Sequence, residues 1–342
     1  MDLSVIVLNW NTKQELADCL MTLEREVARG EEHHKASTRR ESEAVLPREA
    51  TAHLQRASGA SDAAATAATV EAPEVEVIVV DNGSTDGSAH MVAELFPWVR
   101  LIKLPRNLGF SAGNNVGIRQ ARGRYVMLLN PDTLVHPGAL STLVSFADEH
   151  PEAGIIGPRL LNADGSIQYS CRSFPTLATG FFRNTFLGRL FPGNRFNRQY
   201  LLTDWDHSDV RAVDWVSGAA MMIRREVLDQ IGLLDERFFM YCEDVDICYR
   251  ARQAGWEVLY CPHAVITHMI ARASDKNAAA MIIERHKSMF RFFRKHYAAN
   301  SNPLIWPVVV FGLVARASAL VIKNRIDVYR MNRHARRANR AV

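Results

Sequence analysis

Residues 75–88 read VEVIVVDNGSTDGS, and this stretch decides the fold class. Val75–Val80 is a valine-rich run of the kind that forms a buried strand, and we expect the strand to end at Asp81. The polar turn behind it leads into a helix predicted near residues 88–96. A buried strand, a short polar turn and a helix together form the repeating unit of α/β proteins.

The same unit recurs on both sides of this stretch. Short apolar runs predict further strands at Leu3–Leu8, Arg100–Leu104, Tyr125–Leu129, Ile155–Leu161, Ala212–Ile223 and Val258–Cys261. Further helices are predicted near residues 13–28, 112–121, 225–231, 241–254 and 277–297. The alternation predicts an α/β fold built on a mostly parallel, Rossmann-like sheet with helices on both faces.

Composition divides the chain into three parts. The apolar share of 48% and the charged share of 23% are those of a globular protein, and we assign residues 1–28 and 75–300 to one such domain. Residues 29–74 contain twelve alanines, eight acids and six Lys or Arg, with no aromatic residue. We interpret them as a low-complexity insertion that is disordered or loosely helical, with a partner-binding helix as the alternative. Residues 301–342 form a C-terminal helical extension.

The basic residues are concentrated near the C-terminus. Residues 323–342 hold seven Lys or Arg against one acid, a net +6, while the whole chain carries +4 and the remainder therefore −2. A near-neutral body does not predict nucleic-acid binding, whereas the tail predicts contact with something anionic. The five cysteines form no CxxC pair and the N-terminus has no signal-peptide pattern, which together favour a reducing cytoplasm.

An apolar segment precedes this basic tail. Pro303–Ala315 is apolar, Arg316 interrupts it, and Leu320–Ile322 resumes it. Thirteen residues are too few to cross about 30 Å of hydrocarbon, and the longer run contains an arginine that the bilayer centre disfavours. We interpret the segment as a helix on the membrane surface, with Trp306 and flanking basic residues at the interface. A helix packed on the body and a true span are the alternatives.

Polar side chains follow three of the predicted strands. Asn9, Asp81 and Asn130 each stand where a strand ends, and ligands of parallel sheets bind beyond the carboxyl ends of the strands. Pro131 pre-sets a turn that aims Asn130 and Asp132 at the same place, although an ordinary type I turn is the alternative. We therefore expect a binding site at this edge of the sheet.

A second acidic cluster lies about 110 residues further along. Glu243, Asp244 and Asp246 stand among aromatic residues, and apolar neighbours raise the pKa of a carboxyl group and make its anion a better base. Acids that only complement the dipole of a helix are the alternative. His268 follows an apolar run and is either a satisfied polar group or a ligand for a metal or phosphate.

Taken together, these residues resemble the family 2 glycosyltransferases of the GT-A fold, and most of all their bacterial rhamnosyltransferase-like branch. The resemblance covers about residues 1–28 and 75–270 and rests on the order and spacing of several motifs. These are Val5–Asn11, Val79–Ser88, Arg106–Asn115, Leu129–Asp132, Gly218–Met222 and Phe238–Arg250.

The resemblance implies a nucleotide-diphosphate sugar as the donor. Asp81 is similar to the acid that contacts the nucleotide base, and Ser84 would lie near the ribose. Asn9 belongs to the same nucleotide-binding group, and Asn114 lies in the loop that lines the nucleotide pocket. These four residues form the nucleotide site that the resemblance implies.

The resemblance also implies a metal site and a catalytic base. Asp132, with Asn130 and His268, would bind Mg²⁺ or Mn²⁺ and the diphosphate. Asp244, or its neighbour Glu243, would deprotonate an acceptor hydroxyl that attacks the anomeric carbon with inversion.

One residue departs from the family pattern. Asn130 replaces the first acid of the Asp-x-Asp motif, and its oxygen carries no charge, so we expect weaker metal binding. The same Asn-Pro-Asp form is seen in the rhamnosyltransferase-like branch, which makes dTDP-rhamnose the leading donor while UDP- and GDP-sugars stay open. The implied acceptor is a glycan or lipid-linked glycan of a cell-surface polysaccharide, at the cytoplasmic face of the inner membrane.

Other classes fit the sequence less well. An inactive nucleotide- or glycan-binding module would not need Asp81, Asp132 and Asp244 together. A processive synthase would carry Gln-x-x-Arg-Trp and several spanning helices, whereas Gln253–Trp256 reads Gln-Ala-Gly-Trp. No Gly-x-Gly-x-x-Gly follows an early strand and no Gly-Lys-Ser/Thr occurs, which argues against a Rossmann dehydrogenase and a P-loop enzyme.

Overall fold

A computed structural model describes residues 1–44, 72–176, 179, 194–269 and 278–338 of the chain. The strands are β1 (Leu3–Asn9), β2 (Val75–Asp81), β3 (Arg100–Lys103), β4 (Tyr125–Leu129), β5 (Thr133–Val135), β6 (Ala153–Leu161), β7 (Cys171–Arg172), β8 (Arg211–Ala212), β9 (Trp215–Val216), β10 (Ala220–Arg224) and β11 (Glu257–His268). The helices are α1 (Lys13–Ala44), α2 (Ser88–Leu95), α3 (Phe110–Gln120), α4 (Ala139–Glu149), α7 (Arg195–Leu201), α8 (Arg225–Ile231), α9 (Glu243–Gln253), α10 (Ala278–His296), the short 3₁₀ helix η2 (Ala298–Asn300) and α11 (Ile305–Ala338).

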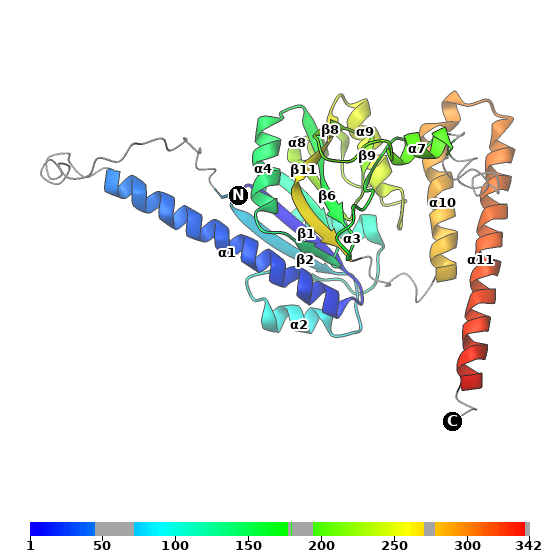
Figure 1. Ribbon diagram of the computed structural model, residues 1–342, viewed down its shortest axis with the longest axis horizontal. Coiled ribbons are helices and arrows are strands. Elements are labelled where there is room, and N and C mark those ends of the chain that lie inside the picture. Colours follow the sequence, from blue (N-terminus) through cyan, green and yellow to red (C-terminus); the bar gives the residue numbers. More distant parts are fainter. Residues whose placement is uncertain (45–71, 177–178, 180–193, 270–277, 339–342) are drawn as a thin grey trace, which may run out of the picture.

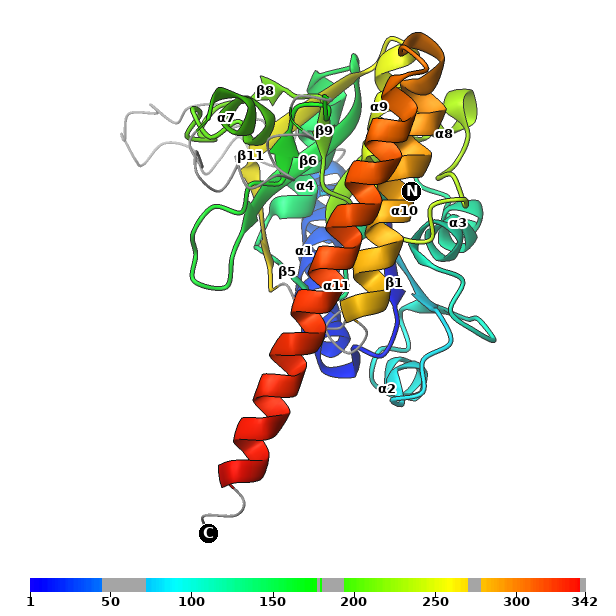
Figure 2. The ribbon, with the colours of Figure 1, turned by 90° about the vertical axis from the view of Figure 1, so that its right-hand side faces the viewer.

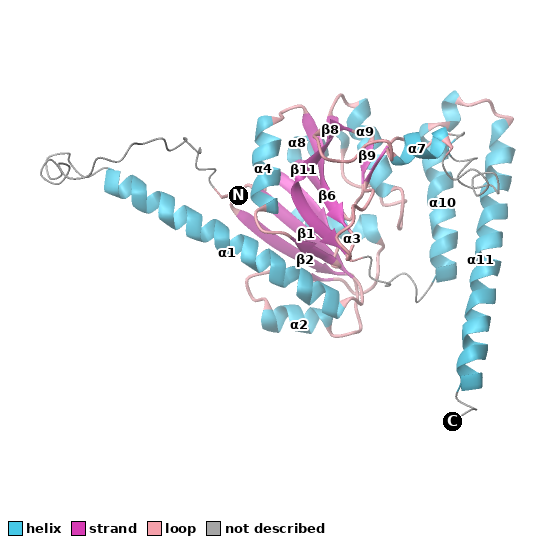
Figure 3. Cartoon of the chain, in the orientation of Figure 1, coloured by secondary structure: helices cyan, strands magenta, loops and turns pink. Residues whose placement is uncertain are grey.

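One large sheet organises the described part of the chain (Figures 1 and 3). Its strand order is β3-β2-β1-β4-β10-β6-β11-β5, with β8 paired to β11. β10 runs antiparallel to both β4 and β6, and β6 is parallel to β11, so β1, β2, β3, β4, β6 and β11 all run in one direction. The predicted mostly parallel sheet is confirmed.

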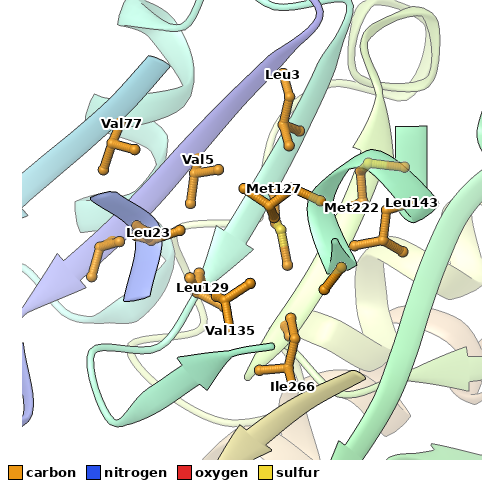
Figure 4. Close-up of a cluster of buried hydrophobic side chains, with 14 of the residues drawn as sticks. Leu3, Val5, Leu23, Val77, Met127, Leu129, Val135, Leu143, Met222 and Ile266 are labelled. Carbon is orange, nitrogen blue, oxygen red and sulfur yellow. The ribbon is translucent and has the colours of Figure 1, made fainter. Parts of the chain in front are cut away.

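Alternating side chains along the strands build two hydrophobic cores, one on each face of the sheet. Val5 and Val7 of β1 point to the core that α1, α2 and α4 cover, together with residues such as Leu23 and Leu143 (Figure 4). Ile6 points to the opposite core, which α3, α8 and α9 cover. The predicted arrangement of helices on both faces is therefore confirmed, and the sheet ends are fixed by packing from both sides.

The second half of the sheet is more broken than predicted. The strand or strand pair expected over Ala212–Ile223 is three strands, β8, β9 and β10, and a turn at Ser217 and Gly218 separates β9 from β10. The strand expected over Val258–Cys261 continues to His268 as β11, past an irregularity between Cys261 and Val265. Helices α4 and α7 were not predicted.

Helix α1 is also longer than the sequence led us to expect. It continues from the predicted end near residue 28 to Ala44, so residues 29–44, the first part of the insertion that we interpreted as disordered or loosely helical, are helical. Glu, Lys, Arg and Ala dominate this segment and have high helix propensity, and extending a helix that is already nucleated costs little. Residues 45–71, which make up the rest of the predicted insertion, lie outside the described residues.

The C-terminal extension, which we placed at residues 301–342, contains helix α11, and α11 lies side by side with α10 (Figures 1 and 2). Helix α10 packs on the body through Phe292, which contacts Tyr249 of α9, and through the Ser288 hydroxyl, which donates to the Met240 carbonyl at 2.8 Å. Helix α11 extends beyond the end of α10 (Figure 2). The predicted C-terminal helical extension is confirmed.

A buried charge network joins α10 to α9. The Asp246 carboxylate is fully buried and accepts from Arg250 at 2.9 Å, Lys295 at 2.6 Å and His296 at 2.7 Å, while Lys295 also contacts Asp235 at 2.7 Å. Burial alone would raise the pKa of Asp246, but the hydrogen bond from His296 and the charges of Arg250 and Lys295 hold this pKa below its usual value. Asp246 therefore anchors the C-terminal helices rather than serving as a second base.

We expect Asp246→Ala to lower the free energy of unfolding by about 3–5 kcal/mol, because it leaves buried cations without their partner. Denaturant unfolding measures this loss. The matched control is Asp229→Ala, which removes an exposed carboxylate from α8 and should change stability by less than about 0.5 kcal/mol. Since the folded-state pKa of Asp246 is lowered, its contribution is present above the unfolded value of about 3.9 and is lost as pH falls through the folded value. Equal stability of the two variants would contradict this assignment.

Candidate active site

The predicted metal ligands lie together where β4 and β11 end. Nε2 of His268 is 3.3 Å from Oδ1 of Asp132 and 3.5 Å from the side-chain amide of Asn130. Strand β5 places them, because Thr133 pairs with His268 in the sheet and the Met269 amide donates to the Asp132 carbonyl at 2.8 Å. The side chains of Asp132 and His268 are 13% and 14% exposed, so a ligand can still reach them.

These residues fit a divalent cation. Gln168 uses its amide nitrogen on Asn162 and on the His268 carbonyl, so its oxygen faces Nδ1 of His268 at 2.7 Å and holds the proton there. In the neutral ring, the lone pair of Nε2 then faces the Asp132 carboxylate. Two electron-pair donors so close are a cradle for a cation.

The protein supplies only part of a coordination shell. No group of three or more His, Cys, Asp or Glu side chains suited to a metal occurs among the residues that the structure describes. Asp132 and His268 are two such ligands, and the Asn130 amide adds a neutral one. Mg²⁺ sites of this open kind take their remaining ligands from substrate phosphates and water.

Three of the four predicted nucleotide-binding residues form one hydrogen-bond network at the ends of β1 and β2. The Asn9 amide donates to Oδ1 of Asp81 and to Oγ of Ser84, both at 3.1 Å, and the Ser84 amide donates to Oδ2 of Asp81 at 3.2 Å. The Thr12 hydroxyl holds the Asn9 side chain by donating to it at 2.7 Å. Asn114 lies on α3 instead, where its side-chain amide donates to the Phe110 carbonyl at 3.0 Å.

Asn82 fixes the loop that leads into α3, and sequence reasoning missed it. Its side chain donates to Asn107 and to the Gly109 carbonyl, and it accepts from the Leu108 amide at 2.8 Å. Gly109 is required here, because its φ is +89° and a Cβ would lie 2.6 Å from the Phe239 carbonyl oxygen. This loop therefore touches the segment before α9, and the edge predicted to bind the nucleotide meets the acidic cluster.

The acidic cluster starts from a strained backbone. Tyr241 and Cys242 are consecutive residues with left-handed φ values of 71° and 67°, and each such residue costs about 1–3 kcal/mol. The turn they make starts α9 at Glu243 and directs Asp244 toward Gly218, whose amide donates to Oδ2 of Asp244 at 3.2 Å. Strain of this kind clusters where a side chain must be held in one position.

Both acids at the start of α9 are poor anions. Burial raises the pKa of Asp244, and the amides of Gly218 and Val245 and the charge of Arg172 offset only part of this effect. Burial, reinforced by the charge of Asp244, raises the pKa of Glu243 well above its usual range, and Oε2 of Glu243 has no hydrogen-bond partner among the described residues. A carboxylate with a raised pKa is the better proton acceptor, and Asp244 is the one held in a defined position.

Two adjacent residues connect the metal cradle to the acidic cluster. The Asn130 amide donates to the Ala219 carbonyl at 2.9 Å, and the amide of the preceding residue, Gly218, donates to Asp244. Asp132 and Asp244 are 112 positions apart in the chain, yet their segments share this one bridge. The structure thus brings the predicted metal and base residues to the same edge of the sheet.

A comparison of the sequence with known families identifies the family to which the sheet, the strand-end polar groups and the paired acids belong. The profile described as "Glycosyltransferase like family 2" matches residues 61–290, and the chain belongs to this family. Family and sheet together confirm the predicted GT-A fold.

Among its relatives, the N-acetylglucosaminyl-diphospho-decaprenol L-rhamnosyltransferase of Mycobacterium tuberculosis is 33% identical over 264 residues, covering 74% of this chain and 85% of the relative. The rhamnosyltransferase WbbL of Escherichia coli is 28% identical over 204 residues, covering 57% of this chain and 74% of the relative. A solved mannosyltransferase from Pyrobaculum calidifontis, in complex with GDP-Man and Mn²⁺, has a TM-score of 0.49 and 18% identity, covering 94% of this chain and 74% of that one.

Proposed function

We propose that this glycosyltransferase is an inverting, metal-dependent rhamnosyltransferase that uses dTDP-rhamnose and a lipid-linked glycan acceptor in cell-surface polysaccharide synthesis. The observation that carries the proposal is the bridge through Gly218 and Ala219, which links Asn130 beside the cation cradle to Asp244. The printed activities of the two bacterial rhamnosyltransferase relatives support the choice of sugar.

The residues divide the chemistry between them. Asp81 and Ser84 bind the nucleoside, and Asp132 and His268, with Asn130, hold Mg²⁺ or Mn²⁺. When bound, the cation neutralises the charge that develops on the leaving diphosphate. Asp244 takes the proton from the acceptor hydroxyl, which attacks the anomeric carbon from the side opposite the diphosphate. One base and one displacement give inversion, and burial keeps the pKa of Asp244 above its usual value.

A donor panel tests this function. The full chain is incubated with dTDP-rhamnose, UDP- and GDP-sugars, each with Mg²⁺, Mn²⁺ or a chelator, and release of free nucleoside diphosphate is measured with and without a lipid-linked acceptor. We expect release from dTDP-rhamnose that needs the metal and increases with the acceptor. Release that persists in the chelator would contradict the metal assignment, and no release from any donor would favour an inactive binding module.

We further propose that α11 lies on the anionic cytoplasmic face of the inner membrane, where a lipid-linked acceptor is found. Its outward face carries exposed apolar residues at helical spacing, Val308, Phe311, Ile322, Ile326 and Tyr329. Its opposite face lies against α10. A cavity of about 410 Å³ lies between the two helices, and Phe290, Val310 and Leu313 help to line it. The +6 tail of residues 323–342 adds attraction to anionic lipid.

The helix is also long and apolar enough, over Ile305–Arg330, to cross a membrane by length and composition. We favour surface attachment because α10 lies along the face of α11 that is opposite its exposed apolar residues. A spanning α11 would draw the charged residues of α10, such as Glu284, Arg291 and Lys295, toward the hydrocarbon, where ionised groups are costly.

We expect the double variant Val308→Asp and Phe311→Asp to move the protein from the membrane to the soluble fraction. Both side chains are exposed, at 68% and 76%, so the fold should tolerate the change while the apolar contact with lipid is lost. Flotation with vesicles containing anionic lipid measures the binding. The matched control is Leu95→Asp, at an exposed position of α2 (61%). Undiminished flotation of the double variant would show that this face does not bind the membrane.

A further inference from the structure

Arg172 of β7 lies beside the acidic cluster, where its neighbours hold it in place. Neither the sequence pattern nor the family motifs singled out this residue. β7 pairs with β9 so that Arg172 lies opposite Trp215. The guanidinium stands over the Trp215 ring at 5.0 Å and over the Tyr200 ring at 6.0 Å. Its Nη2 donates to the Tyr169 carbonyl at 3.3 Å. Stacking and a single hydrogen bond thus fix the planar group and leave most of its donors unused.

The unused donors are the observation that points to a ligand. Nε of Arg172 is buried and has no hydrogen-bond partner among the described residues. Among the residues that the structure describes, no carboxylate lies within 4.0 Å of Arg172 as an ion-pair partner. The positive charge of Arg172 nevertheless lowers the pKa of Asp244. A half-buried guanidinium with free donors is suited to bind a phosphate oxygen with paired hydrogen bonds.

The position of Arg172 indicates which phosphate. The donor diphosphate is assigned to the cation at Asp132 and His268, and Gln168, which orients His268, is four positions before Arg172. Arg172 itself stands across from Trp215, two residues before Ser217 and Gly218 lead to Asp244. Asp244 must touch the acceptor hydroxyl, so an anion at Arg172 belongs to the acceptor. A sugar linked to lipid through a diphosphate carries its anion on the same ring as that hydroxyl.

We propose that Arg172 binds the diphosphate of a lipid-diphosphate-linked acceptor and so selects that acceptor class. This inference rests on the proposed function, since it assumes that Asp244 serves the acceptor side. The guanidinium has a second effect, because its charge offsets the repulsion between the incoming diphosphate and the Asp244 carboxylate. Arg172 is therefore a specificity-determining residue that touches substrate.

The test compares two acceptors on the full chain. One is N-acetylglucosamine linked by a diphosphate to a short prenol, and the other is the octyl glycoside of the same sugar, without phosphate. For Arg172→Gln we expect the KM of the diphosphate acceptor to rise by about 10- to 100-fold, the loss of a charge-assisted hydrogen bond. The KM of the glycoside, the KM of the donor and donor hydrolysis without acceptor should stay within about twofold. Arg172→Lys, which keeps the charge but not the fork, should lie in between.

Arg211→Gln is the matched control, because Arg211 also stacks on a tryptophan, Trp205 at 4.4 Å, but pairs with the opposite end of β11. It should leave both acceptors unaffected. An equal loss with both acceptors would overturn the inference, because Arg172 would then act only through Asp244. A rise in the donor KM would also overturn it.

A binding measurement separates this inference from the proposed function. Calorimetry with the diphosphate acceptor alone needs no sugar transfer and no donor. We expect Arg172→Gln to weaken binding by the same factor as the KM change. Undiminished binding by this variant would refute the role of Arg172 whatever the donor panel shows, whereas a wild type that binds the acceptor but transfers no sugar would refute only the proposed reaction.

Discussion

Replacing Asp244 with asparagine is expected to lower kcat by about 10²- to 10⁴-fold, because it removes the general base without changing the size of the side chain. Asparagine keeps one oxygen, which can accept the hydrogen bond that the Gly218 amide donates at 3.2 Å, while the bond from the Val245 amide to the other oxygen is lost. The Kd of the nucleoside diphosphate should not change. Single-turnover transfer, together with calorimetric binding of the nucleotide, measures both quantities.

The pH dependence gives this prediction a direction. Burial raises the pKa of Asp244, and the base must be deprotonated to act, so activity should fall at a higher pH than for an ordinary aspartate as the solution is acidified. Glu243→Gln should leave both transfer and this acid limb in place, because the raised pKa of Glu243 keeps its side chain neutral while Asp244 titrates. If Glu243→Gln abolished transfer and Asp244→Asn kept it, the base would be Glu243.

Replacing Asp132 with alanine is expected to lower kcat/KM by at least about 10³-fold, since a bound cation contributes several kcal/mol of charge stabilisation and 1.36 kcal/mol corresponds to tenfold. The loss should appear first as weaker binding of Mn²⁺ in the presence of nucleoside diphosphate. Manganese titration followed by electron paramagnetic resonance measures this binding. Asp229→Ala is the control, and an Asp132→Ala variant that keeps full activity would show that the metal assignment is wrong.

The sequence was sufficient for the first half of the fold. Strands β1, β2 and β4 are buried on both faces, so their sequences are mainly apolar, interrupted only at Ser4 and Glu76, and a polar residue such as Asn9 or Asp81 marks the strand end. This pattern is local and does not depend on partners. The strand ends then meet at one edge because parallel strands must point the same way.

The second half could not be predicted in the same way. β7 and β9 contain two residues each and exist only because they pair with each other, so no local periodicity announces them. Helix α1 is longer than predicted because charged residues that favour helices also give a segment the composition of a disordered one. A weak local signal accounts for the short strands, and a composition that helices share with disordered segments accounts for α1.

The residues of the candidate site could be predicted from the sequence, but the contacts between them could not. Carboxylates, amides and a histidine at the ends of strands have an obvious chemistry, so Asp81, Asp132, Asp244 and His268 were named from sequence, and their roles stay predictions. Gln168 and Arg172 act through partners that are distant in the chain, namely His268 at 100 positions and Trp215 at 43. Nothing in their neighbouring residues distinguishes them from ordinary polar side chains.

An anomalous difference map from crystals grown with Mn²⁺ and dTDP tests the central claim most directly. The account predicts a manganese peak within about 2.5 Å of Asp132 and His268, the ordinary reach of an oxygen-bound divalent cation. It also predicts the nucleoside beside Asp81 and the β-phosphate on the side of the cation that faces Asp244. A manganese peak elsewhere, or dTDP bound away from both Asp132 and Asp244, would contradict it.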